Sequence, residues 1–261
     1  MTNTVTVPTG NIVGMVFSLV VGWGLPIALC IWIRRKYKAD LTAFFLGCGT
    51  YFVFAMVLEQ VLHAVVLLRL GGVSEALKNN IWLYALYGGL AAGVFEETGR
   101  FLTMRYLMRK NLTLENALMY GAGHGGFEAM LVLGITSINN LVNAFLLNSG
   151  VFTAALSENV NVQQALEAVA PLATLPAWQF FLGGIERIMA VALQIALSLI
   201  IYQAVSRRKR RYLYPVAILF HALIDMAVLV VANHGYLIYA EAVTLAGTAA
   251  VCWFSWRCQK Q

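Results

Sequence analysis

The chain has 261 residues, of which 60% are hydrophobic and only 11% are charged, and its mean hydropathy is +0.74. This composition excludes an ordinary soluble globular domain, in which about a quarter of the residues are charged. The formal net charge of +6 arises from basic residues at the ends of apolar runs, so it indicates orientation in a membrane rather than binding to nucleic acid.

Seven apolar runs are each long enough to form a helix that crosses a bilayer, since about 20 helical residues span ~30 Å of hydrocarbon. In chain order these runs cover residues 11–33, 41–68, 81–104, 114–137, 178–204, 213–232 and 236–256. They lack the alternation of apolar and polar residues that a membrane β-barrel requires. The sequence therefore predicts an all-α, polytopic integral membrane protein of about seven transmembrane helices. We expect a single membrane-embedded domain with one long connection, at residues 139–176.

The basic residues gather at four alternate ends of these helices. Of the 18 Lys and Arg residues, 14 follow the first, third, fifth and seventh helices. Cytoplasmic loops carry an excess of Lys and Arg, so we expect the N-terminus outside and the C-terminus in the cytoplasm. The predicted partner of all seven helices is the lipid bilayer.

Ionisable residues recur inside the third, fourth and sixth predicted helices. A charge near the bilayer centre is costly, so such residues usually face the interior of the helix bundle and mark a functional site. Three pairs share the spacing i, i+4, which places both members on one helix face. These pairs are Glu96 and Arg100 in EETGR, His124 and Glu128 in GHGGFE, and His221 and Asp225 in HALID.

One residue from each pair lies at a common depth. At ~1.5 Å per residue, Glu96, His124 and His221 are about 12 to 16 Å from the cytoplasmic ends of their helices. A glutamate beside a histidine can hold and deprotonate a water molecule, and donors on another helix can stabilise an oxyanion. The three residues could instead bind zinc, although the sequence contains no HExxH motif.

Other interpretations use the same kinds of residue. Each pair taken alone could be a structural tie between helices, and this is the preferred reading of Glu59 with His63 and of Glu186 with Arg187. A transporter would show inverted repeats or broken helices in matching halves, and neither is present in the sequence. A noncatalytic membrane partner would tolerate the loss of Glu96 and His124.

The order of the motifs EETGR, GHGGFEA and HALID resembles that of the CAAX-protease and bacteriocin-processing group of intramembrane proteases. More closely, the chain is similar to the bacterial YhfC family of membrane peptidases, and the similarity includes LEQVLH, WLYALYGGLAAG, SINNLV and GGIERIMA. This resemblance implies an intramembrane endopeptidase of the bacterial plasma membrane that needs no metal cofactor. Its substrate would be a membrane-associated protein or peptide.

The resemblance also implies a role for each motif. Glu96 matches the glutamate that activates water, with Glu97 and Arg100 supporting it, and His124 matches the histidine that shares this water. The third motif matches a pair of residues that faces the oxyanion. The candidate catalytic residues are therefore Glu96, Glu97, Arg100, His124, Glu128, His221 and Asp225.

Two positions depart from the pattern of the wider group. The first motif is EExxR here rather than EExxxR, so Arg100 projects differently from the helix. The third motif ends in Asp225, where prenyl-processing members often have Asn. An ionised aspartate cannot donate to an oxyanion, so Asp225 is protonated, or orients His221, or has a different role.

Overall fold

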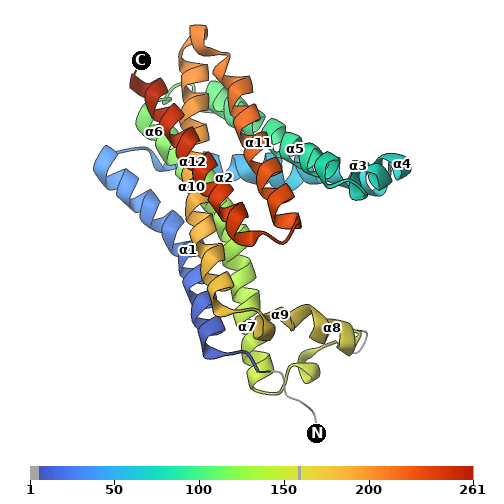
Figure 1. The fold of residues 1–261 in the computed structure, drawn as a ribbon. Coiled ribbons are helices and arrows are strands. Elements are labelled where there is room, and N and C mark those ends of the chain that lie inside the picture. The colour runs from blue at the N-terminus through green and yellow to red at the C-terminus, as the bar shows by residue number, and fades with distance from the viewer. Residues whose placement is uncertain (1–5, 158–159, 261) are drawn as a thin grey trace. The chain divides into compact units, whose positions relative to one another are not determined.

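The computed structural model describes residues 6–157 and 160–260, and every regular element within these ranges is a helix (Figure 1). This confirms the predicted all-α class. By their internal contacts, the residues divide into two compact units. Unit 1 is Met1–Pro26 with Ala129–Ile188, and unit 2 is Ile27–Glu128 with Met189–Gln261. The prediction of a single domain stays a prediction.

The helices follow one another with short connections. In chain order they are α1 (Thr9–Tyr37), α2 (Leu41–Tyr51), η1 (Phe52–Glu59), α3 (Gln60–Leu68), α4 (Gly71–Lys78), α5 (Ile81–Leu102), η2 (Thr103–Leu107), α6 (Leu114–Ala129), η3 (Met130–Ile135), α7 (Thr136–Asn148), η4 (Thr153–Ala155), α8 (Val162–Val169), α9 (Pro171–Thr174), α10 (Ala177–Ser206), η5 (Arg208–Arg210), α11 (Leu213–Asn233) and α12 (Leu237–Lys260). The segments η1, η2 and η3 are π-helical, a rare form that often occurs at functional sites.

Six helical segments in the described part of the chain are long and apolar enough to cross a membrane. They are Thr9–Tyr37, Leu41–Leu68, Leu114–Asn148, Ala177–Ser206, Arg208–Asn233 and Leu237–Lys260. The third predicted span, residues 81–104, coincides with α5, a helix of 22 residues. It is not among these six segments, and it contains Glu96, Glu97 and Arg100.

The predicted boundaries agree with the observed helices except after residue 137. The fourth predicted helix continues to Asn148, so the first part of the predicted connection 139–176 is helical. The next element within that connection is the short turn η4. The helix α8 follows, and it begins where the side chain of Asn161 accepts a hydrogen bond from the Gln164 backbone N–H. Residues 158 and 159 of the connection lie outside the described residues.

Close helix contacts in unit 2 bring the three sequence motifs together. The helix α11 packs along α5 and against α12 (Figure 1). A Cβ atom at Gly89 of α5 would lie 2.4 Å from the Ala222 carbonyl oxygen of α11, and one at Gly123 of α6 would lie 2.0 Å from the Phe44 carbonyl oxygen of α2. Larger residues would force these backbones apart, because glycine permits the closest approach of helices in a membrane.

Each unit has its own apolar core. In unit 2, fully buried residues such as Ile33, Met104, Leu197 and Leu213 belong to one continuous cluster. In unit 1, a smaller cluster contains Met15, Ala144 and Leu172. The buried charged residues described below all lie in unit 2, within helices that contribute to its core.

Candidate functional site

Arg100 is the centre of a buried charged cluster on α5. Its side chain is fully buried, and so is that of Glu97, while Glu96 is nearly so. Arg100 Nη1 donates to Glu97 Oε1, and Arg100 Nη2 donates to Glu96 Oε2 over 3.2 Å. The spacings i, i+3 and i, i+4 allow one guanidinium group to reach both carboxylates from the same helix.

His124 of α6 joins this cluster at Glu96. The distance between His124 Nε2 and Glu96 Oε2 is 2.9 Å, and the histidine is fully buried. An ionised carboxylate can only accept, so with Glu96 ionised this bond is donated by His124 Nε2. Within the described residues, His124 Nδ1 and Glu97 Oε2 are buried and have no hydrogen-bond partner.

His221 of α11 joins the cluster at Glu97, the neighbour of Glu96. The distance from His221 Nδ1 to Glu97 Oε1 is 2.9 Å, and the distance from His221 Nε2 to Asp225 Oδ2 is 3.5 Å. Both ring nitrogens therefore face carboxylate oxygens. The side chain of Asp225 is 40% exposed, whereas that of His221 is 4% exposed, so Asp225 marks the accessible edge of the cluster.

A further member of the cluster, Gln194 of α10, was missed by the sequence analysis. Its Nε2 donates to Glu96 Oε2 over 3.2 Å and to Glu128 Oε2 over 2.7 Å, while its Oε1 accepts from Arg100 Nη2. An amide carries no charge, so Gln194 does not stand out among the ionisable residues of the helices. The available signal was an amide in the middle of the apolar run MAVALQIALSLII.

The structure thus brings all seven candidate residues into one network across α5, α6 and α11, to which Gln194 of α10 also belongs. Glu128 enters this network through the Gln194 amide. Glu97 contacts His221 as well as Arg100, a pairing that the motif order did not predict. The catalytic roles themselves stay predictions.

The remaining predicted pairs make hydrogen bonds of their own. Glu59 Oε1 lies 3.2 Å from His63 Nε2, and His63 Nδ1 lies 2.8 Å from the Tyr87 hydroxyl oxygen. The Arg187 guanidinium binds the carboxylate of its neighbour Glu186. The contact between His63 and Tyr87 connects α3 to α5, and the structural role of these pairs stays a prediction.

The cluster has the donor types that zinc prefers, which are imidazole and carboxylate groups. Nevertheless, among residues 6–157 and 160–260 no group of three or more His, Cys, Asp or Glu side chains is arranged to hold a metal ion. His124 contacts Glu96, whereas His221 contacts Glu97. Arg100 also places a positive charge against both carboxylates. The donor types fit zinc, but their arrangement does not.

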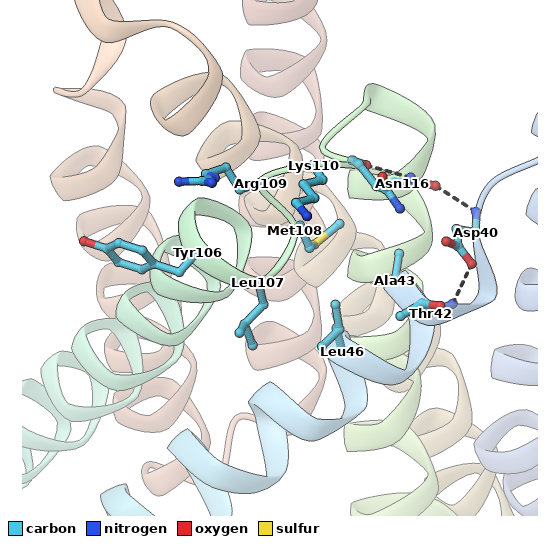
Figure 2. A pocket seen from close by; sticks show the side chains of 11 residues that line it. Asp40, Thr42, Ala43, Leu46, Tyr106, Leu107, Met108, Arg109, Lys110 and Asn116 are labelled. Carbon is cyan, nitrogen blue, oxygen red and sulfur yellow. Dashed lines mark hydrogen bonds between the residues drawn. The ribbon is translucent and has the colours of Figure 1, made fainter.

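A cavity of about 340 Å³ lies at the end of unit 2 where η2 and the start of α2 meet. Figure 2 shows Asp40, Lys110 and Asn116 around it. The Thr42 backbone N–H donates to the Asp40 carboxylate and lowers the pKa of this group below its usual range. None of the candidate catalytic residues lines this cavity, so it is distinct from the charged cluster.

Comparison with known proteins assigns the chain to a family. The model of the family described as YhfC intramembrane metalloprotease matches residues 21–246. A protein of Bacillus subtilis (strain 168), described as "Uncharacterized membrane protein YhfC", is 43% identical over 235 residues, which are 90% of each chain. No solved structure matches the chain. The chain belongs to the YhfC intramembrane metalloprotease family.

Proposed function

We propose that this protein is an intramembrane endopeptidase that hydrolyses a peptide bond of a membrane protein or peptide with water activated by Glu96 and His124. The family to which the chain belongs supports peptide hydrolysis within the membrane. The observation that carries the proposal is the 2.9 Å contact between Glu96 and His124 from two different helices. It joins a general base to a partner that can hold the same water.

Glu96 is the general base of this reaction. Its carboxylate accepts a proton from the water, and the resulting hydroxide attacks the carbonyl carbon of the scissile bond. When the tetrahedral intermediate collapses, the same proton passes from Glu96 to the leaving nitrogen. Arg100 and His124 hold the carboxylate while the proton arrives and leaves.

His221 stabilises the oxyanion of the intermediate by donating from Nε2. Both ring nitrogens of a histidine donate only in the imidazolium form, so His221 acts as a cation whose Nδ1 donates to Glu97 Oε1 and fixes the plane of the ring. Asp225 lies 3.5 Å beyond Nε2 at the accessible edge of the cluster. Of the roles left open by the sequence, we infer that Asp225 orients His221 until the substrate carbonyl takes its place.

A test of the proposed function is hydrolysis by the purified protein in liposomes. The probe is a panel of single-pass transmembrane peptides, each with a fluorophore and a quencher. We expect cleavage of at least one peptide, with a single cleavage site identified by mass spectrometry. Unchanged cleavage by a Glu96→Gln variant prepared in parallel would assign the activity to a contaminant.

A zinc-dependent mechanism is the alternative, and the description of the family supports it. Zinc would be held by Glu96, His124 and His221 and would activate a bound water as a Lewis acid. The present contacts would have to change for these three residues to converge. We infer the metal-independent glutamate mechanism, because Arg100 already supplies the positive charge beside Glu96 and Glu97.

Chelation separates these two mechanisms. A zinc chelator that reaches the cytoplasmic face is expected to leave the rate of peptide cleavage within about twofold of the untreated rate, because no catalytic step requires the metal. Metal analysis of the active protein is the second measurement. One zinc per chain, lost together with activity in His124→Ala, would establish the metalloprotease mechanism instead.

We further propose a multi-pass topology in the bacterial plasma membrane, with the N-terminus outside and the C-terminus in the cytoplasm. The supporting observation is that 14 of the 18 basic residues follow four alternate helices. Green fluorescent protein fused after Ser206 is expected to fluoresce, while alkaline phosphatase fused at the same position is expected to be inactive. Active phosphatase at this position would reverse the orientation.

A further inference from the structure

We propose that Gln194 is a positioning residue that fixes the carboxylate of Glu96 so that one oxygen, Oε1, faces the attacking water. This inference rests on the proposed function, because it assumes that Glu96 is the base. Gln194 itself touches neither the water nor the substrate. It acts through the orientation that it gives to Glu96.

The two oxygens of the Glu96 carboxylate are bonded unevenly. Three donors from three helices meet on Oε2: Arg100 Nη2 and Gln194 Nε2 at 3.2 Å each, and His124 Nε2 at 2.9 Å. Within the described part of the chain, Glu96 Oε1 receives no hydrogen bond. The carboxylate is therefore held through one oxygen, while the other is free to accept a proton.

The Gln194 side chain is itself fixed at both ends of its amide. Its Oε1 accepts from Arg100, and its NH₂ group donates to Glu96 and to Glu128. An amide offers two donors and an acceptor in one plane. A glutamate here would add a third carboxylate beside Glu96 and Glu128, and a lysine would oppose Arg100.

The helix α6 leaves space for the Gln194 side chain. A Cβ atom at Gly125, next to His124, would lie 2.7 Å from the Cβ atom of Gln194. The glycine therefore lets α10 approach α6 closely enough for the amide to reach Glu96. This packing shows that the glycine beside the catalytic histidine accommodates Gln194.

The decisive variant is Gln194→Met, which preserves length but removes every hydrogen bond of the amide. A misplaced catalytic group can cost about 10²-fold in rate, so we expect kcat on the transmembrane peptides to fall by about 10- to 100-fold. KM should not change, because Gln194 does not contact the substrate. An unchanged kcat, or an effect confined to KM, would overturn the proposal.

Gln203 is the matched control. It is a buried glutamine on the same helix, and it binds Gln259 and Arg210 rather than the catalytic cluster. Gln203→Met is expected to lower the thermal stability of the protein while leaving kcat and KM per folded molecule unchanged. An equal loss of kcat in both variants would reduce Gln194 to a general structural role.

A thermal measurement tests the contact without using activity. Loss of a hydrogen bond to a charged group is expected to lower Tm by about 3 °C or more. Gln194→Met should therefore lower Tm less in a Glu96→Ala background than in the wild type, whereas Gln203→Met should act equally in both. If Gln194→Met lowered Tm equally in the wild type and in the Glu96→Ala background, the proposal would be overturned.

The failure of this inference is distinguishable from the failure of the proposed function. If Glu96→Gln cleaves peptides as well as the wild type, the function is wrong. If Glu96→Gln is inactive while Gln194→Met retains the wild-type kcat, only the role of Gln194 is wrong.

Discussion

Replacement of Glu96 by Gln is expected to lower kcat for transmembrane peptides by about 10²-fold or more. The substitution keeps the size of the side chain and its ability to accept from Arg100 and His124. It removes the negative charge and the basic oxygen that would take a proton from water. KM and the yield of folded protein should change little, because the packing around residue 96 is preserved.

Glu75→Gln is the control for this substitution. Glu75 lies on α4 and is exposed, so removing its charge should leave both kcat and stability unchanged. Measurement of kcat and KM for both variants, normalised to monodisperse protein, separates a chemical defect from misfolding. Wild-type turnover by Glu96→Gln would remove the general base from the mechanism, and the peptidase proposal would no longer stand.

Helix positions were predictable from the sequence because the membrane imposes a length on apolar runs. The predicted run 213–232 corresponds to α11, and 178–204 corresponds to α10. The end of the fourth helix was not predictable in this way. Residues 138–148 include four asparagines in INNLVNAFLLN, which interrupt the apolar run, although the helical backbone continues to Asn148.

The convergence of three motifs was predictable because each places ionisable residues at helical spacing and at a similar depth. The spacing of these residues shows which helix face and which depth they share, but it does not show which side chains of other helices they contact. It could not assign His221 to Glu97 rather than to Glu96, because adjacent residues on α5 differ only in their rotation about the helix axis. It missed Gln194, because only ionisable residues were taken as candidates and an amide carries no charge.

Removal of the Arg100 charge is expected to have the largest effect on stability. Arg100→Met leaves two buried carboxylates, Glu96 and Glu97, without the cation that binds both. Breaking a buried ion pair by removing one partner costs about 3–5 kcal/mol, which corresponds to a fall in Tm of about 10 °C for a protein of this size. We expect little folded protein in the membrane and a low Tm for the fraction that is recovered.

The control variant is Arg109→Met, which removes an exposed arginine near the end of η2 and should change Tm by no more than about 2 °C. The double variant Glu97→Gln with Arg100→Met tests the electrostatic cause directly. It removes one of the two uncompensated carboxylates, so its Tm should lie above that of Arg100→Met alone. If the double variant were no more stable than the single one, lost packing of the arginine side chain would explain the defect instead of the buried charge.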